Sequence, residues 1–357
     1  MQRKYLEFKK KEKNLSSTKS KILLVYTGGT IGMVKDYNSG ALKAFNFKKL
    51  LKNIPELNQL DCDVKSISFK EPIDSSDINT AHWIHIAEII EKYYRVYDGF
   101  VILHGSDTMS YTASALSFLL ENLNKPVILT GSQLPIGDLR TDAKENLITA
   151  IQIASLKERD RSVVREVGLY FEYKLYRGNR TTKINAEHFQ AFASRNYPHM
   201  MESGVHLNVQ KEYLLKPNNR KKCIVHKQLD TNVAILKLFP GITENVLESV
   251  LNTKELKVLV LETYGSGNAP TEAWFLNALK NAVKKGMHII NVTQCSGGGV
   301  IMGQYETSEQ LKKLQIINGK DITTEAAITK AMYMLGTGIS DKLFKTIFET
   351  SLRGEMS

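Results

Sequence analysis

Two glycine-bounded turns carry hydroxyl groups that could serve as nucleophiles. Thr30 follows a Tyr-Thr-Gly-Gly run, and Ser106 follows Leu-His-Gly. A Ser or Thr hydroxyl is a weak nucleophile and needs a base, which a desolvated lysine paired with an acid can provide. Asp107 directly follows Ser106, and Lys183 lies in the polar segment RGNRTTK. These residue types favour nucleophilic hydroxyl chemistry, although spacing alone does not distinguish Lys183 from a solvated lysine.

Apolar runs must position these turns. Residues 22–26 and 99–103 are bounded by glycine and are typical of buried parallel strands. Gly28 and Gly29 permit a tight path with positive φ. Open α/β sheets bind ligands beyond the carboxyl ends of their strands. We therefore predict one crevice that contains both hydroxyl-bearing turns.

Strands and helices alternate along the chain, which predicts an α/β fold with mostly parallel sheets. Further strands are expected at 64–69, 125–129, 167–173, 233–238, 257–261 and 288–292. Helices are expected at 81–94, 110–122, 143–156, 244–251 and 271–284, followed by two more helical stretches. A long loop at 33–46, a short helix from 47 and irregular segments at 175–192 and 200–223 complete the prediction. One of Ser75, Ser76 and Asp77 is expected to cap the helix at 81–94.

These elements predict two domains. Residues 1–20 are expected to form a basic, disordered arm, residues 21–205 a larger domain with the catalytic turns, residues 206–228 a linker, and residues 229–357 a smaller α/β domain. The net charge of +11 raises the possibility of nucleic-acid binding, but the first 21 residues alone carry eight Lys/Arg and two Glu. A basic tail without an RNA-binding motif is more often a solvated arm, so we expect no nucleic-acid partner.

Composition argues against several other classes. No apolar run reaches transmembrane length, so no membrane partner is expected. Three isolated cysteines and scattered histidines show neither a disulfide framework nor metal-ligand spacing, and we expect no metal. Unpaired cysteines and the lack of a signal-peptide pattern favour a cytoplasmic protein. The turn TGGTIG lacks the glycine spacing of a dinucleotide fingerprint and the Walker lysine, and the chain has no G-x-S-x-G elbow.

Longer motifs resemble the L-asparaginase family. The segments YTGGTIGM and LHGSDTMSYTASALSF resemble its two signatures, and as a pair they are highly specific. Supporting segments occur in the family's order, namely DSSD, TGSQLP, LYRGNRTTK, YGSGNAP, NVTQC and SLRGE. The resemblance extends over nearly the whole chain after the arm and is similar to the bacterial type I, cytoplasmic branch.

The resemblance implies hydrolysis of L-asparagine to L-aspartate and ammonia, without a cofactor. It implies an acyl-forming nucleophile at Thr30 and a second catalytic group of Ser106, Asp107 and Lys183. It places substrate-binding positions at Gly29, Ser75, Ser76, Gly105, Ser106, Asp107 and Asn268, the last from a neighbouring subunit. It also implies a larger N-terminal domain, a flavodoxin-like C-terminal domain, and a homodimer or homotetramer.

Three positions depart from the family pattern. Ser106 stands where the family usually has threonine, which removes the methyl group that restricts χ1. The stretch SGALKAF aligns with the family's lid loop but has no tyrosine, and Tyr37 falls a few residues early. Some cytoplasmic relatives bind asparagine at a regulatory site that includes an arginine. Glu262 occupies that position here, whereas Thr182, Thr293 and Cys295 match other parts of the site, so we expect no such regulation.

Two other functions remain open from the sequence. The chain could be the asparaginase-like subunit of a tRNA-dependent amidotransferase, but that subunit has an additional N-terminal domain and the arm is too short for one. It could also be a binding protein that senses asparagine without turnover. The presence of Thr30, Asp107 and Lys183 argues for an enzyme, and ammonia release would distinguish these alternatives.

Overall fold

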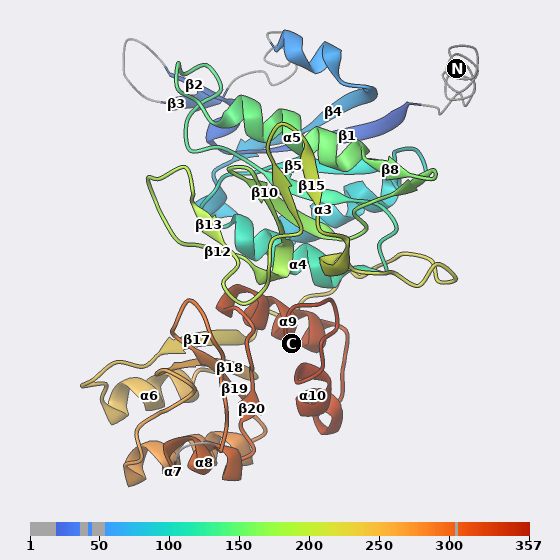
Figure 1. Ribbon diagram of the computed structural model, residues 1–357. Coiled ribbons are helices and arrows are strands. Elements are labelled where there is room, and N and C mark those ends of the chain that lie inside the picture. Colours follow the sequence, from blue (N-terminus) through green and yellow to red (C-terminus); the bar gives the residue numbers. More distant parts are fainter. Residues whose placement is uncertain (1–18, 36–41, 45–53, 304–305) are drawn as a thin grey trace, which may run out of the picture.

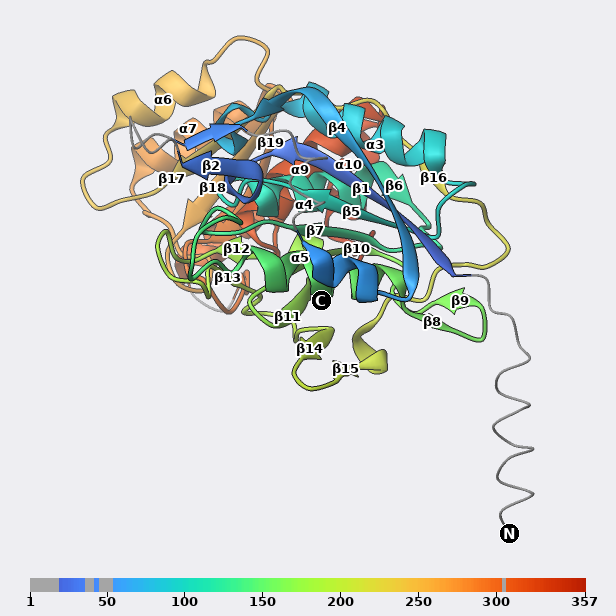
Figure 2. The ribbon, with the colours of Figure 1, turned by 90° about the horizontal axis from the view of Figure 1, so that it is seen from above.

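A computed structural model describes residues 19–35, 42–44, 54–303 and 306–357. It contains a large mixed sheet and a separate small parallel sheet, each covered by helices (Figure 1). In spatial order the large sheet consists of β15 (Leu207–Val209), β14 (Met201–Ser203), β11 (Lys174–Arg177), β10 (Val167–Phe171), β7 (Val127–Thr130), β5 (Gly99–Leu103), β1 (Ser20–Gly28) and β4 (Cys62–Ile73). The strands from β10 to β4 are parallel (Figure 2). The predicted α/β class is confirmed.

Buried side chains cover both faces of the large sheet because successive strand residues point to opposite sides. On one face, Leu24 and Val101 pack with α5 (Ala143–Ser155). On the other, Val25 and Ile102 pack with α3 (Thr80–Tyr93) and α4 (Met109–Leu119). The near-continuous apolar sequence of β1 and β5 follows from this two-sided burial.

The smaller domain is a four-stranded parallel sheet in the order β17 (Val233–Lys237), β18 (Val258–Thr263), β19 (His288–Thr293) and β20 (Ile317–Asn318). One face contacts α9 (Thr324–Gly336) and α10 (Asp341–Phe348). The other face contacts α6 (Glu244–Leu251), α7 (Ala273–Lys284) and α8 (Glu306–Lys313). Helices α4 and α9 join the domains, and the rings of Phe118 and Tyr333 stack with centroids 6.0 Å apart.

Several segments expected to be irregular contain short elements. The expected loop at 33–46 includes a hairpin of β2 (Met33–Lys35) and β3 (Leu42–Ala44). The segment after β10 forms β11, the 3₁₀ turn η4 (Gly178–Arg180), and the pair β12 (Thr182–Lys183) and β13 (Phe192–Ala193). Strands β14 and β15 extend the large sheet, so its last strand lies within the range assigned to the linker. The short helix expected from residue 47 and most of the arm lie outside the described residues.

The remaining elements are short. Two-stranded pairs form between β6 (Leu120–Glu121) and β16 (Ile224–Val225), and between β8 (Lys157–Glu158) and β9 (Arg161–Ser162). The 3₁₀ turns are η1 (Thr30–Gly32), η2 (Pro55–Gln59), η3 (Ser75–Asp77) and η5 (Lys211–Tyr213).

The structure corrects the predicted end of the arm and the predicted cap of α3. Ser20, assigned to the arm, is buried at the start of β1 and donates a hydrogen bond to the Ser155 carbonyl. The cap of α3 is Asn79, whose side-chain oxygen accepts from the Ala81 amide, while Ser75 lies in η3. The asparagine is better placed because it directly precedes the first helical residue.

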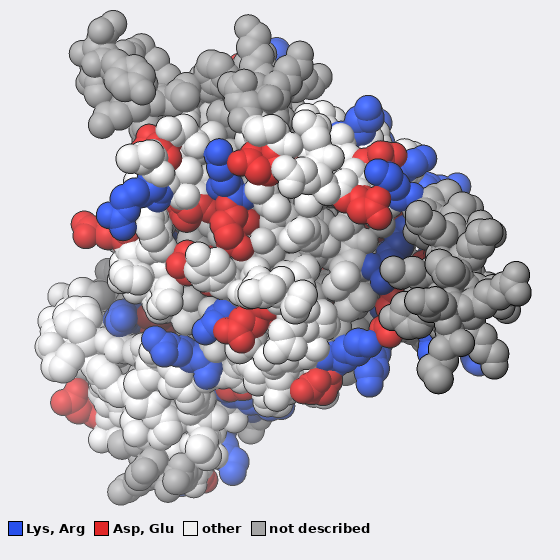
Figure 3. All heavy atoms as spheres, turned by 45° about the horizontal axis from the view of Figure 1, so that its top comes forward, with Lys and Arg blue, Asp and Glu red and all other residues white. Residues whose placement is uncertain are grey.

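No described helix has the length and apolar character needed to cross a bilayer. Figure 3 shows Lys and Arg side chains interspersed with Asp and Glu over the described part of one face. The described atoms of that face therefore do not present the continuous basic stripe that is typical of a nucleic-acid interface.

Candidate active site

The three polar turns meet at the carboxyl ends of β1, β5 and β4. A Cβ atom built on Gly29 would lie 2.5 Å from the Gly105 nitrogen, and one built on Gly105 would lie 2.5 Å from the Ser75 Oγ. Gly29 also has φ of 86°, in the region that favours glycine. Side chains at these two glycines would separate the turns, so glycine is required for the crevice to form.

Threonine hydroxyls hold the turns together. Thr27 Oγ1 donates to the Leu103 carbonyl at 2.9 Å and joins the first turn to the second. Thr108 Oγ1 donates to the Ser75 carbonyl at 2.6 Å and joins the second turn to the third. Both hydrogen bonds link segments that are far apart in sequence, so they fix the relative positions of the candidate groups.

Lys183 contacts both predicted partners in the second turn. Its Nζ lies 2.8 Å from Ser106 Oγ and 2.6 Å from Asp107 Oδ1. The Lys183 side chain is 17% exposed, whereas that of Asp107 is 65% exposed. The ammonium is thus largely withdrawn from solvent, and the carboxylate keeps a free side toward an incoming ligand. The structure brings together Ser106, Asp107 and Lys183.

Gln133 is a member of this group that the sequence analysis did not assign. Ser106 Oγ donates to Gln133 Oε1 at 3.2 Å, and Gln133 Nε2 donates to the Ala186 and His188 carbonyls at 3.1 Å each. The Asp142 carboxylate accepts from the Gln133 amide at 3.0 Å. Burial raises the pKa of Asp142. The segment TGSQLP drew attention to this turn, but only the folded chain places Gln133 beside the hydroxyl.

Thr30 lies at the start of η1, directly after the Gly29 contact with the second turn. The residue is half-buried. Its hydroxyl has no hydrogen-bond partner among the residues that the structure describes, and Tyr37 lies outside them. The crevice therefore presents two hydroxyls in different settings: Ser106 is bonded to an ammonium, and Thr30 adjoins the glycine turn.

His104 links the second turn to helix α4. Its Nδ1 lies 2.6 Å from the Gly105 carbonyl oxygen, and its Nε2 lies 2.9 Å from Thr112 Oγ1. Thr112 already accepts a hydrogen bond from the Trp83 indole, so its own hydroxyl proton faces Nε2 and the imidazole proton is assigned to Nδ1. Burial lowers the pKa of His104 to about 4, so the ring is neutral at physiological pH. The histidine positions the backbone before Ser106.

The residues that match parts of a possible second site fall into two adjoining groups. Thr182 Oγ1 donates to Glu325 Oε2 at 3.1 Å, and the neighbouring Thr324 Oγ1 donates to Glu262 Oε1 at 2.6 Å. Thr293 Oγ1 donates to the Gly265 carbonyl, and the Cys295 amide donates to Thr293 Oγ1 at 3.0 Å. Thr293 pairs with Thr263 in the register of β18 and β19, one position beyond Glu262.

The Glu262 carboxylate gives the group around Thr182 and Glu325 a negative character. Burial raises the pKa of Glu325, and the charge of Glu262 adds to the rise. Lys237 lies 3.9 Å from Glu262 but is 65% exposed, so it compensates only weakly. An anionic ligand group would meet unfavourable charge here.

Asn268 lies in the smaller domain. Its backbone pairs with Tyr264 in an isolated bridge, and it borders a surface hollow lined also by Phe239 and Trp274. Phe239 is 50% exposed. Among the described residues, no group of three His, Cys, Asp or Glu side chains is arranged to hold a metal ion.

Comparisons with known proteins identify the family of this chain. The family model described as asparaginase, N-terminal, matches residues 21–214, and the one described as glutaminase/asparaginase C-terminal domain matches residues 232–348. L-asparaginase 1 of Escherichia coli is 41% identical over 95% of this chain and 98% of that protein. A 60 kDa lysophospholipase of Mus musculus is 36% identical over 94% of this chain, which spans 62% of that protein.

A solved structure resembles both domains together. L-asparaginase I of Vibrio cholerae is 37% identical and superimposes with a TM-score of 0.87, covering 95% of this chain and 100% of the other. Sequence and structure thus match over both domains. The chain belongs to the L-asparaginase family.

Proposed function

We propose that this protein hydrolyses L-asparagine to L-aspartate and ammonia. The observation that carries the proposal is the contact of Lys183 with Ser106 and Asp107 beside the Gly29–Thr30 turn. A half-buried lysine bonded to a hydroxyl can move a proton to or from a reacting centre. The similarity to L-asparaginases over both domains supports the choice of substrate.

The reaction has two halves. Thr30 Oγ1 attacks the side-chain amide carbon, its proton passes to the departing nitrogen, and the C–N bond breaks to release ammonia. A water molecule then attacks the resulting ester, and L-aspartate leaves as the Thr30 hydroxyl is restored. Ser106 relays protons between Lys183 and the reacting centre or its water. Backbone amides of the turns near Thr30 and Ser106 are the proposed donors to the oxyanion.

The substrate's charged ends require separate partners. The η3 turn offers the Ser75 hydroxyl and amide as donors to the α-carboxylate, while the Ser76 amide and hydroxyl both donate to Asp74 and hold the turn in shape. The exposed side of Asp107 can accept the α-ammonium while Oδ1 stays with Lys183. This arrangement would orient the side-chain amide toward Thr30.

We also propose a homodimer or homotetramer in which Asn268 of a neighbouring subunit completes each site. The position of Asn268 on the smaller domain, beside exposed Phe239, supports this arrangement. A cytoplasmic location is proposed from the similarity to the Escherichia coli enzyme. No cofactor is required for the steps above.

Ammonia release from L-asparagine tests the proposal directly. The purified chain should release ammonia and L-aspartate in equal amounts, with a kcat/KM for L-glutamine that is much lower. Lys183→Met provides the catalytic control. Binding of L-asparagine without ammonia release would instead identify a sensor, and comparable kcat/KM values for both amides would contradict the expected preference.

A further inference from the structure

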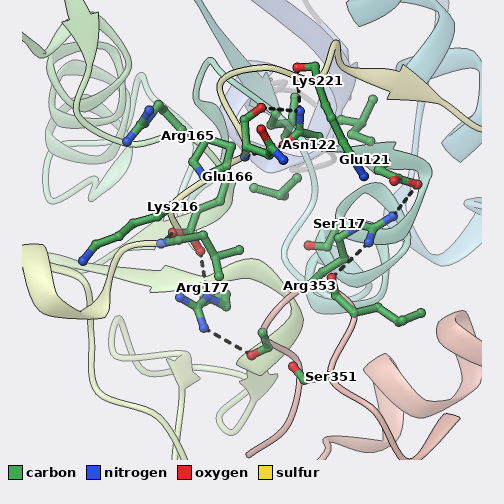
Figure 4. A pocket seen from close by; sticks show the side chains of 18 residues that line it. Ser117, Glu121, Asn122, Arg165, Glu166, Arg177, Lys216, Lys221, Ser351 and Arg353 are labelled. Carbon is green, nitrogen blue, oxygen red and sulfur yellow. Dashed lines mark hydrogen bonds and ion pairs between the residues drawn. The ribbon is translucent and has the colours of Figure 1, made fainter. Parts of the chain in front are cut away.

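Apart from the hollow beside Asn268, a first candidate hollow lies at the amino-terminal end of the parallel strands, opposite to the catalytic turns. It borders the first residue of β10, Val167, whereas Ser106 follows the carboxyl end of the parallel strand β5. The loop 215–221 forms one wall and the C-terminal segment 351–354 forms another (Figure 4). Its volume of about 430 Å³ lies within the range of small-molecule sites.

The walls of this hollow are fixed by hydrogen bonds. The Leu215 amide donates to Glu166 Oε1 at 2.6 Å. Asn122 Nδ2 donates to the Asn218 and Lys221 carbonyls at 3.0 and 2.7 Å, and Asn122 Oδ1 accepts from the Asn218 amide at 2.8 Å. Both ends of the loop are therefore held in place without a ligand, so binding would require little ordering of the chain.

The opposite wall is fixed by arginines. Arg177 donates to the Gly354 carbonyl at 3.3 Å and to Glu166 at 2.7 Å. Arg353 Nη2 donates to Glu121 at 2.9 Å. Each acid that lines the hollow is thus neutralised by an arginine that also lines it.

Three further cations remain after this pairing. Arg165, Lys216 and Lys221 line the hollow, and none forms an ion pair with a described acidic residue. Lys216 and Lys221 are exposed at its mouth. The hollow therefore carries an excess of positive charge, which favours an anionic occupant.

Guanidinium donors are also left unused. The Nε atoms of Arg165 and Arg353 are buried and have no hydrogen-bond partner among the described residues. Arg165 Nη1 donates to Asn219 at 3.1 Å, so this side chain is held in place with its Nε free. The Arg165 guanidinium therefore keeps hydrogen-bonding capacity beyond its bond to Asn219, and its remaining Nη donors are the ones that a ligand oxygen could use.

An adjoining hollow strengthens the positive charge. It shares Arg165, Leu215 and Lys216 with the first and is lined also by Arg159 and Arg161. Its own ion pair, between Lys211 and Glu158 at 2.7 Å, leaves these arginines as additional positive charge. The charge is thus concentrated where Arg165 and Lys216 separate the two hollows.

The lining between the cations is apolar. Leu120, Leu123, Val167, Pro217 and Leu352 contribute to the first hollow. From this combination we infer that the hollow is a binding site for a small phosphate ester with a flat, apolar body, such as a nucleoside monophosphate. The phosphate contacts Arg165 and Lys216, and the body packs on the apolar residues.

Calorimetric titration of the full chain tests this site. The probes are AMP, inorganic phosphate and adenosine, each at low ionic strength. AMP should bind more tightly than inorganic phosphate, and adenosine should bind most weakly, because the site needs both the charge and the body. Raising the salt concentration should weaken AMP binding, because two of the three cations are exposed.

Single-charge variants locate the binding. Arg165→Gln and Lys216→Gln should each weaken AMP binding about tenfold or more, whereas Lys254→Gln, a 93%-exposed lysine of the smaller domain, should leave it unchanged. Saturating L-aspartate should not displace AMP. No binding of AMP, equal affinity in all three variants, or displacement by L-aspartate would each overturn the assignment.

Discussion

Lys183 and Ser106 are 77 residues apart in sequence, yet Lys183 Nζ lies 2.8 Å from Ser106 Oγ. The β12 strand that carries Lys183 follows η4, whose Arg180 donates to Asp321 of the smaller domain at 2.8 Å. The lysine is therefore positioned by contacts in both domains. This contact is the core of the proposed second catalytic group.

Replacing Lys183 should abolish most activity without unfolding the chain. Lys183→Met removes the ammonium but keeps a side chain of similar length, so kcat should fall by several powers of ten, as expected for groups that act as a unit. Steady-state ammonia release measures the loss. Lys174→Met, on the neighbouring β11, is the matched control and should retain activity. Near-normal turnover by folded Lys183→Met would exclude Lys183 from the catalytic group.

His104 should make the fold less stable as the pH falls. Its folded pKa of about 4 lies below the ordinary value of 6.5, so the unfolded chain binds a proton that the folded chain excludes. This contribution is constant above pH 6.5 and declines as the pH falls toward 4, with a loss of about 2 kcal/mol by pH 5.

Chemical denaturation of His104→Asn at several pH values measures this effect. The decrease in unfolding free energy between pH 7 and pH 5 should be smaller in that variant than in the parent chain. The exposed His85 is the control, and His85→Asn should retain the parent's decrease. An unchanged decrease in His104→Asn would show that other groups account for it.

A buried ion pair links helix α9 to the C-terminal segment. Lys330 and Glu355 are fully buried, form an ion pair, and Lys330 Nζ also donates to the Phe348 and Thr350 carbonyls at 2.7 Å each. Glu355→Gln leaves the ammonium buried without its carboxylate and should cost about 3–5 kcal/mol of unfolding free energy. Denaturant titration measures this cost. Glu158→Gln breaks the exposed pair with Lys211, which solvent screens, and should cost much less unfolding free energy than Glu355→Gln. Similar losses in the two variants would contradict the assigned role of burial.

Glu262 should prevent a second asparagine molecule from binding as a regulator beside Thr182 and Glu325. Its carboxylate accepts from Thr324 and lies near buried Glu325, so the α-carboxylate of a second asparagine would meet negative charge. Initial rates against L-asparagine concentration should follow a hyperbola. A Hill coefficient clearly above one, constant over a range of enzyme concentrations, would refute this prediction.

The strands that carry the turns could be predicted because the features that specify them, an apolar run and a nearby glycine, lie close together in the sequence. The continuous apolar runs of β1 and β5 end in glycine, and both appear where expected. The turn after β10 was missed because Glu172 and Tyr173 adopt positive φ of 45° and 66° without the usual glycine or asparagine. The predicted strand therefore ran two residues too long, and β11 was taken for loop.

The candidate site depended on contacts between distant segments. Spacing alone did not select Lys183, which required the family resemblance, and it gave no reason to choose Gln133. Gln133 meets Ser106 only because Asp142 and two carbonyls after Lys183 fix its backbone and amide. Gly29 and Gly105 indicated the site more clearly than Lys183 or Gln133 did. The close approach of these two glycines explains why neither position can carry a side chain.

Removing the Thr30 hydroxyl and removing the Ser106 hydroxyl should block different steps of the reaction. Thr30 adjoins the glycine turn and has no hydrogen-bond partner for its hydroxyl among the described residues, whereas Ser106 is already bonded to Lys183. Thr30→Ala should bind L-asparagine but form no covalent adduct. Ser106→Ala should lose several powers of ten in kcat, and Ser106→Thr should stay active because it keeps the hydroxyl.

Mass spectrometry of the intact protein, quenched during reaction with a slow ester or electrophilic analogue of L-asparagine and followed by peptide mapping, tests the assignment of the nucleophile most directly. We predict an adduct on Thr30 in the parent chain and in Ser106→Thr, and none in Thr30→Ala. An adduct mapped to Ser106, with Thr30→Ala still acylated, would contradict it.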